Sequence, residues 1–323
     1  MTHHWGYVGV VASALLFGLS ATLNKIAVAD VNPTVVAGFA YLFAGIALAA
    51  LRFSPLRSGI MRLLKTPTQT EFTFCRKDAW ILAFVVLSGS TIAPFLFMNG
   101  LNASTAVNAS LLLNVESLFT VLIAIFFLRE KAHKKDWFGI VLLIAGAVFL
   151  TTNAQFGTLT LTEALVGNMM IVGACLFWGI DNNLSKLLCF KEDLLLVTSA
   201  KCLLGGSALL LVSGILGLGL LIPLSVFPYL IIVGVFSIGL SILFFMLGLR
   251  DIGSLRTGVI FSTSSLFGAA FAFAVLGEEF TLIQVAAGLV MILGVYVLYR
   301  KWGSNLECAV SQQSCLRGVV AIS

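Results

Sequence analysis

The sequence predicts an all-α membrane protein with ten transmembrane helices, arranged as two inverted repeats of five helices each. Three observations lead to this prediction: the amount of apolar sequence, the placement of lysine and arginine, and an internal repeat. Of 323 residues, 59% are hydrophobic and only 10% are charged, whereas about a quarter of the residues in a typical soluble domain are charged. The composition therefore favours an integral membrane protein over a soluble one.

Apolar segments long enough to cross a bilayer recur along the whole chain. A helix needs about 20 residues to cross a hydrocarbon core of about 30 Å. Pro33, Pro223 and Pro228 lie at or near the expected helix starts, where the missing N–H group costs little. The ten expected helices are at residues 6–28, 33–51, 79–98, 104–127, 137–153, 165–188, 194–217, 224–249, 255–276 and 282–300.

Lysine and arginine are concentrated on one side of this topology. With the N-terminus inside, only Lys25 and Lys201 of the 19 basic residues fall clearly outside the inner segments, and the outer loops contain none. Basic loops stay in the cytosol, so we expect a multi-pass protein of the cytoplasmic membrane with both termini cytosolic. The net charge of +5 is explained by these loops and does not imply nucleic acid as a partner. The inner segments are 52–78, 129–136, 189–193, 250–256 and the tail after 299.

The two halves of the chain align with each other. Residues 6–25 align with 167–186, and the stretch "SLFTVLIAIFFLRE" (117–130) aligns with "SLFGAAFAFAVLGE" (265–278). Since each half has an odd number of predicted helices, the halves must have opposite orientations in the bilayer. Inverted repeats are typical of secondary transporters, in which the substrate binds near the midplane between the repeats. Matched positions include Gly6/Gly167, Gly18/Gly179, Lys25/Lys186, "FMNGL" (97–101)/"FMLGL" (245–249) and Gly146/Gly294.

The order of short motifs in both halves resembles the EamA-type family of the drug/metabolite transporter superfamily. The resemblance spans residues 5 to about 302, and implies EamA-like five-helix repeats at 5–153 and 165–302, followed by a flexible cytosolic tail at 303–323. The chain departs from the family, which often has a proline inside the fourth and ninth helices, where it has "NVES" and "STSS". The motifs are "LFWG"-like residues 15–18 and 176–179, Gly-Leu at 100–101 and 248–249, and Leu-x-Glu at 128–130 and 276–278.

The resemblance implies transport of small organic solutes, such as amino acids, related metabolites or drugs. We expect secondary active transport by alternating access, coupled to protons or to exchange, with export preferred. The alternatives are an uncoupled facilitator and, less favoured, a membrane enzyme or a non-transporting scaffold. Because the sequence has no phosphate-binding loop and no His/Cys cluster, we expect no cofactor, no metal and no enzymatic activity. The expected partners are a small-molecule substrate and the lipid bilayer, and the oligomeric state is left open.

Glu116 is the first candidate for proton coupling or substrate binding. It lies near the middle of the expected helix 104–127, with leucine and phenylalanine on both sides. Apolar surroundings favour the protonated form of a carboxyl group, and an ionisable group at membrane depth is a functional candidate by default. The alternative is a protonated side chain that joins two helices. Asn108, two turns before Glu116, is a candidate for substrate binding, whereas Asn114 is expected to point almost oppositely and not to line the same narrow cavity.

Asp181 and Lys201 form a second pair of candidates. Each lies about 10 Å from the cytosolic boundary of its helix, and adjacent antiparallel helices would bring them into contact. They are either a structural ion pair or a binding site in which Lys201 meets a substrate carboxylate. Further substrate-binding candidates are Asn24, Trp178 and Ser264, although such residues in membrane helices more often serve packing. Glu130 and Glu278 are expected at helix ends, with a gating role as the alternative.

Overall fold

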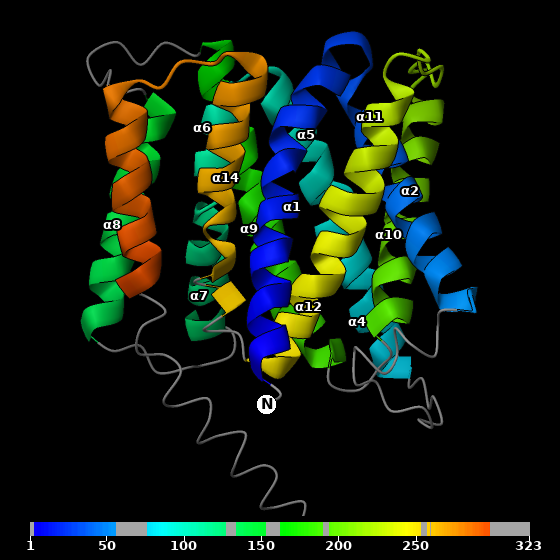
Figure 1. Ribbon diagram of the computed structural model, residues 1–323, viewed down its shortest axis with the longest axis horizontal. Coiled ribbons are helices and arrows are strands. Elements are labelled where there is room, and N and C mark those ends of the chain that lie inside the picture. Colours follow the sequence, from blue (N-terminus) through cyan, green and yellow to red (C-terminus); the bar gives the residue numbers. More distant parts are fainter. Residues whose placement is uncertain are drawn as a thin grey trace, which may run out of the picture.

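The protein is a bundle of helices that run side by side (Figure 1). The computed structural model describes residues 3–55, 76–126, 134–152, 162–189, 194–252, 257–258 and 260–297, and all elements in these ranges are helical. Glu130 and the tail at 303–323 lie outside the described residues. Glu116, Asp181, Lys201 and the other candidate residues lie within them.

The first half of the chain contains six α-helices and a π-helical segment among the described residues, and a further α-helix ends the half. Asn32 caps the second helix, because its side chain accepts a hydrogen bond from the Thr34 N–H (3.0 Å) and Pro33 follows it at the first helical position. The elements are α1 (His3–Asp30), α2 (Pro33–Phe53), α4 (Arg76–Val85), η1 (Val86–Ile92, π-helical), α5 (Ala93–Asn102), α6 (Ala106–Leu112), α7 (Val115–Phe126) and α8 (Lys134–Thr152).

The second half repeats this order. A helix at Leu282–Val297 ends the described part of the chain, and residues 257–258 and 260–261 are helical as well. The other elements are α9 (Glu163–Cys189), α10 (Leu194–Ile215), α11 (Phe227–Ile232), η2 (Val233–Leu240, π-helical), α12 (Ser241–Asp251), α14 (Ser264–Phe271) and η3 (Ala272–Leu276, π-helical).

Seven helical segments of the described chain are long and apolar enough to cross a membrane. Three shorter apolar helices, Trp137–Thr152, Ser264–Leu276 and Leu282–Val297, coincide with the other three expected spans. The apolar exterior of the bundle agrees with this, since large side chains such as Leu211, Ile215 and Leu289 are exposed. The chain is therefore a multi-pass helical membrane protein. The seven long segments are Gly6–Asp30, Pro33–Phe53, Asp78–Asn102, Ala106–Ile123, Glu163–Ser185, Leu194–Ile215 and Phe227–Gly248.

Two of the expected helices, 104–127 and 255–276, are not continuous, and the prediction was wrong on this point. Between α6 and α7 the backbone makes tighter i→i+3 hydrogen bonds, from Asn114 N to Leu111 O (3.2 Å) and from Glu116 N to Leu113 O (3.1 Å). The Asn114 amide also donates to the Leu111 carbonyl (3.1 Å). A side chain that bonds a nearby carbonyl competes with the helical hydrogen bond, which explains a break without proline.

The second break lies at the matched position, before α14. Thr263 N donates to Ile260 O (3.1 Å) and Ser265 N to Ser262 O (3.3 Å), while the Ser265 hydroxyl donates to the Ser262 carbonyl (2.8 Å). The two breaks are bonded to each other, because the Asn114 amide donates to Ser265 Oγ (2.9 Å). The N-termini of α7 and α14 consequently begin inside the bundle rather than at its surface.

Helix contacts come in reciprocal pairs that follow the internal repeat. A Cβ atom placed on Gly18 of α1 would lie 2.8 Å from the Cβ of Phe267 on α14. A Cβ atom on Gly179 of α9 would lie 2.9 Å from the Cβ of Phe119 on α7. Gly18 matches Gly179 and Phe119 matches Phe267 in the repeat alignment, so the same contact occurs twice with the halves exchanged.

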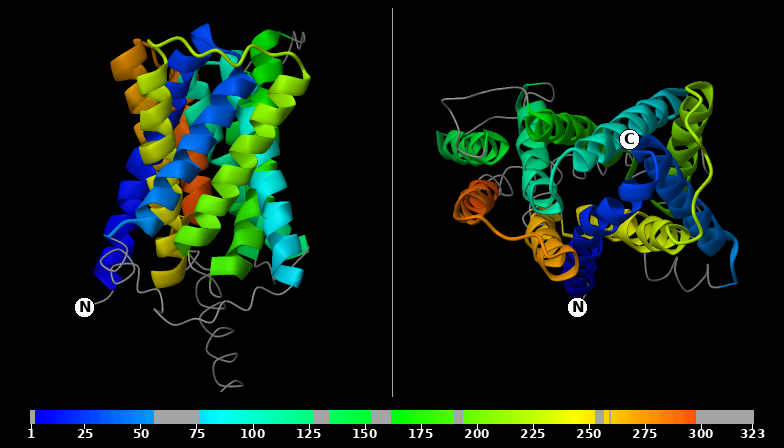
Figure 2. Two further views of the ribbon diagram at one scale, coloured as in Figure 1. Left: turned by 90° about the vertical axis from the view of Figure 1, so that its right-hand side faces the viewer. Right: turned by 90° about the horizontal axis from the view of Figure 1, so that it is seen from above.

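The last helix of each half obeys the same reciprocity. Gly146 of α8 packs directly against Met291, and Gly294 packs against Leu143, with a Cβ atom on Gly294 3.0 Å from the Leu143 side chain. Gly146 matches Gly294 and Leu143 matches Met291. These two helices lie together at one edge of the bundle, seen from the side in Figure 1 and from above in Figure 2.

Replacing Gly18 by alanine is expected to lower the free energy of unfolding by about 1–3 kcal/mol, because the added Cβ would meet Gly268 N and Ser264 O of α14 at 3.0 Å. The matched control is Gly214→Ala in α10, where nothing lies within 4 Å of the added atom. The control is expected to leave stability unchanged or to raise it by up to about 1 kcal/mol. Unfolding in detergent measures both, and equal effects would contradict close packing of α1 on α14.

Candidate functional site

Two adjoining cavities lie at the centre of the bundle, next to the breaks described above. They measure about 30 Å³ and about 50 Å³. We call the first the serine-lined cavity, since Ser262, Ser264 and Ser265 contribute to its wall, and the second the ion-pair cavity, since Asp181 and Lys201 line it. Five residues line both cavities and thus form their common wall: Phe17, Glu116, Asn182, Phe245 and Phe261.

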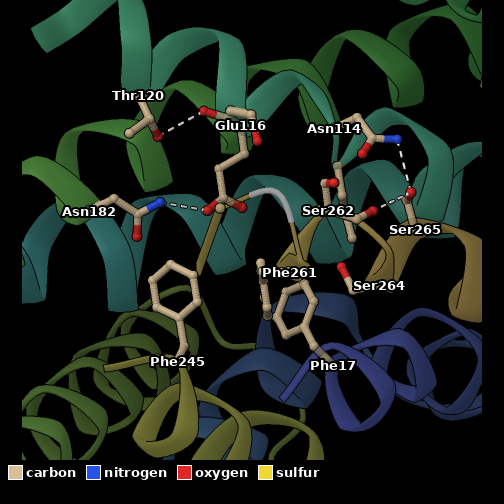
Figure 3. A pocket seen from close by; sticks show the side chains of 13 residues that line it. Phe17, Asn114, Glu116, Thr120, Asn182, Phe245, Phe261, Ser262, Ser264 and Ser265 are labelled. Carbon is tan, nitrogen blue, oxygen red and sulfur yellow. Dashed lines mark hydrogen bonds between the residues drawn. The ribbon is translucent and has the colours of Figure 1, made fainter. Parts of the chain in front are cut away.

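Glu116 belongs to this common wall and projects from the first turn of α7. Its Oε1 atom accepts a hydrogen bond of 2.6 Å from the Asn182 amide of α9, as Figure 3 shows. Its backbone carbonyl accepts a hydrogen bond from the Thr120 hydroxyl (2.9 Å). The break before α7 places the carboxylate near a helix N-terminus, where the helix dipole favours a negative charge.

Asn114 lies at the same cavity as Glu116, which corrects the expectation that the two point apart. Both residues line the serine-lined cavity, and Figure 3 shows them on the same side of it. The expectation assumed a continuous α-helix. The tighter turn from Leu111 to Ser117 has fewer residues per turn, and this changes the angle between the two side chains.

The structure places Asp181 and Lys201 in contact within the ion-pair cavity. Lys201 Nζ lies 2.6 Å from Asp181 Oδ2, and the two side chains are 2% and 6% exposed. The Ser185 hydroxyl donates to the other carboxylate oxygen (2.8 Å). A buried ion pair needs this kind of additional hydrogen bonding, because both charges have been removed from water.

The π-helical segment η1 brings a backbone carbonyl to the same place. The Trp178 indole N–H donates to Gly89 O (3.1 Å), and the Tyr41 hydroxyl lies 3.5 Å from the same atom. A Cβ atom on Gly89 would overlap the Asp181 carboxylate, so α9 can approach η1 closely only because this residue is glycine. π-Helical turns often mark functional sites, and this one supports the wall that holds Asp181 and Trp178.

The remaining sequence candidates divide into two groups. Ser264 lines the serine-lined cavity and Trp178 the ion-pair cavity. Asn24 and Asn108 do not line either one. Asn24 is 1% exposed, and its Oδ1 atom has no hydrogen-bond partner in the described chain. Asn108 accepts a hydrogen bond from the Gln284 amide (2.8 Å) near the start of α6.

Sequence reasoning did not single out three residues of the common wall. Asn182 adjoins Asp181 in the sequence, and Phe245 and Phe261 lie in apolar segments where phenylalanine usually serves packing. One signal was present, because Phe245 occupies the position in "FMLGL" that matches Phe97 in "FMNGL". Phe97 packs against Trp178 (ring centroids 5.4 Å apart).

A second polar cluster lies where α5 meets α6, and its residues line neither cavity. Gly277 has φ +69° and ends η3, so that the chain turns and Glu278 reaches α6. Its two carboxylate oxygens accept hydrogen bonds from Ala106 N (2.9 Å) and Val107 N (2.8 Å). Lys25 Nζ donates to the carbonyls of Leu101 (2.7 Å) and Ser104 (2.5 Å). Glu278, from the second half, thus caps a helix of the first half, while Lys25 binds the C-terminus of α5.

Comparison with models of known protein families shows which family this chain belongs to. The sequence model of the EamA-like transporter family matches residues 4–152 and 165–300. The chain belongs to the EamA-like transporter family. It has two EamA repeats, one in each half, and is a membrane transporter of the drug/metabolite type.

Relatives of this EamA-like protein carry transporter names as well. An uncharacterized transporter of Methanothermobacter thermautotrophicus is 41% identical over 299 residues, which cover 93% of this chain and 87% of the relative. The uncharacterized transporter YyaM of Bacillus subtilis is 24% identical over 301 residues, covering 91% and 93%. One solved crystal structure has a TM-score of 0.65 and 16% identity, covering 92% of this chain and 96% of its own. That likeness shows a shared fold.

Proposed function

We propose that this EamA-like protein is a proton-coupled secondary transporter of small organic solutes, such as amino acids and related metabolites. It would work by alternating access between two inverted five-helix repeats, at residues 5–153 and 165–302, in the cytoplasmic membrane with both termini cytosolic. The observation that carries the proposal is the position of Glu116. This carboxylate lies in the common wall of two central cavities, at a broken helix that contacts the other half of the chain.

The reciprocal contacts support the inverted repeat. In an inverted pair, a two-fold axis in the membrane plane relates the halves, so each contact between them must occur twice with the partners exchanged. Gly18 with Phe267, and Gly179 with Phe119, behave in this way. The breaks before α7 and α14 also fit, because discontinuous helices form the central sites of inverted-repeat transporters.

The size of the cavities supports movement during transport. Sites for organic ligands in proteins usually measure about 300–1,000 Å³, whereas these cavities measure about 30 and 50 Å³. An organic solute can enter only if the walls separate. The two halves meet at this wall, and rocking of one half against the other would enlarge the site and open it to one side.

Six side chains at the site have proposed roles. Glu116 binds the proton or the solute, and Asn182 positions its carboxylate. Trp178 and Ser264 line the space that the solute occupies. Asp181 and Lys201 either hold α9 and α10 together or exchange their mutual contact for one with the solute.

A transport assay with purified protein in proteoliposomes tests the proposal. An inward and an outward pH gradient should each change the rate of solute uptake in the wild type, with amino acids and small amines screened as solutes. Glu116→Gln is expected to lower the gradient-driven uptake rate by about tenfold or more, because the group that binds and releases the proton is lost. Glu279→Gln, at an exposed position, is the matched control and should behave as the wild type. Uptake by the wild type that ignores the gradient would make the protein an uncoupled facilitator.

A further inference from the structure

We propose that the transported solute is a monovalent organic cation, such as a protonated amine, held between the Glu116 carboxylate and the rings of Phe17, Phe245 and Phe261. The inference deepens the proposed transport function and rests on it, because it names the chemical class that the same site would accept. Charge, hydrogen bonding and the aromatic wall each support it.

The charges of the two cavities do not balance. Among the described residues that line them, the formally charged side chains are Glu116, Asp181 and Lys201. Asp181 and Lys201 compensate each other at 2.6 Å. Glu116 then leaves the site with one negative charge when it is ionised. A bound monovalent cation makes the site neutral, whereas a bound anion would double the uncompensated charge at membrane depth.

The Glu116 carboxylate has room for a donor. Its Oε1 atom accepts a hydrogen bond from the neutral Asn182 amide, and an ionised carboxylate offers about four acceptor positions on its two oxygens. The side chain is partly exposed toward the two cavities. An ammonium group in the serine-lined cavity would donate to this carboxylate, and charge-assisted hydrogen bonds of this kind are about twice as strong as neutral ones.

Aromatic rings complete the opposite side of the common wall. Phe261 packs against Phe17 (ring centroids 5.2 Å apart) and against Phe245 (4.7 Å apart). Figure 3 shows Phe245, Phe261 and Phe17 across the cavity from the Glu116 carboxylate. The face of an aromatic ring attracts a cation through its quadrupole and does not attract an anion. A cation that lies over the face of one of these rings would therefore be favoured by the rings as well as by Glu116.

Proton and solute would compete for one carboxylate. Protonated Glu116 makes the site neutral without a solute, and ionised Glu116 makes it neutral with one monovalent cation. The exchange of one proton for one cation would then move no net charge across the membrane. Asp181, Lys201 and Tyr41 line the ion-pair cavity together with Glu116. The Cys175 thiol, which donates to the Leu112 carbonyl (3.5 Å), also interacts electrostatically with Glu116.

Three solutes with the same ring and different charge test this inference. Benzylammonium, benzyl alcohol and phenylacetate are added to the purified protein in detergent, with methylammonium as a smaller cation, and thermal unfolding is followed. The two cations should raise the melting temperature, and the alcohol and the anion should not. Glu116→Gln is expected to weaken benzylammonium binding by about tenfold or more, the effect of losing a charge-assisted hydrogen bond. Phe261→Leu should weaken it less. The melting temperatures without solute show that each variant is folded.

Three results would overturn the inference: neither cation binds, phenylacetate or benzyl alcohol binds as tightly as benzylammonium, or Glu116→Gln leaves benzylammonium binding unchanged. Failure of the transport proposal is distinguishable from these. Proteoliposomes that move neutral or anionic solutes along a pH gradient would keep the transport function and reject the cation site. Cation binding without any solute movement would keep the site and reject the transport function.

Discussion

Replacing Lys201 by alanine is expected to lower the free energy of unfolding by about 3–5 kcal/mol, the usual cost of removing one partner from a buried ion pair. The Lys201 side chain is 2% exposed and its ammonium group lies 2.6 Å from Asp181. Without Lys201, Asp181 keeps one hydrogen bond, from Ser185, and no nearby cation among the described residues. Denaturant titration in detergent, with unfolding monitored by tryptophan fluorescence, measures the loss.

The double variant Asp181→Ala, Lys201→Ala distinguishes two roles of this pair: joining α9 to α10, or binding the solute. Removing both charges is often neutral for stability, so we expect the double variant to recover most of the stability that Lys201→Ala loses. If the pair only joins α9 to α10, transport recovers as well. If either residue contacts the solute, the double variant is stable and does not transport. A double variant as unstable as Lys201→Ala would show that the pair is not the source of the loss.

Replacing Glu278 by alanine is expected to cost about 2–3 kcal/mol of stability, because the carboxylate satisfies two backbone N–H groups at the start of α6 and hydrogen bonds to a charged group are among the stronger ones. Ala106 and Val107, which donate them, are 0% exposed. The next N–H, of Asn108, is bonded to Thr105 Oγ1 (3.1 Å). Because the two donor residues are themselves buried, water would replace Glu278 poorly.

Glu279 provides the matched control, since it is the adjacent acid and is exposed. Glu279→Ala should change the free energy of unfolding by less than about 0.5 kcal/mol, as surface substitutions usually do. Because Glu278 and Ala106 belong to different halves, Glu278→Ala should also increase labelling of a cysteine introduced at Ala106, which is 0% exposed, by a water-soluble thiol reagent. Unchanged stability and unchanged labelling would contradict the role of Glu278 in joining the halves.

The positions of the helices could be predicted from the sequence, because every span needs a long apolar segment and such segments are unambiguous in this composition. The breaks in two of them could not. They depend on the Asn114 amide, which bonds both the Leu111 carbonyl and Ser265 of the other half. The second of these contacts exists only after the halves have assembled. The absence of proline from "NVES" and "STSS" removed the usual local sign of a break.

The charged part of the site could also be predicted, and the aromatic part could not. Glu116, Asp181 and Lys201 stand out because an ionisable group is costly at membrane depth. The structure places all three at the central cavities, while their roles stay predictions. Phe245 and Phe261 lie in helices where phenylalanine is common. Only the fold reveals that these side chains lie across the cavity from Glu116.

The central site is built on a symmetric frame with an asymmetric distribution of charge. Glu116 matches Ser264, and Asp181 and Lys201 match Ser20 and Ala40 in the repeat alignment. Among the described residues that line the cavities, the formal charges therefore all lie on the wall formed by α7, α9 and α10, and the related wall of α14, α1 and α2 carries none. If two identical halves exchanged conformations, the two states would have equal energy. In the alternating access proposed above, the charged wall would lie in different surroundings in each state. The empty protein would then have a preferred resting state, and the solute gradient alone would not set which side it faces.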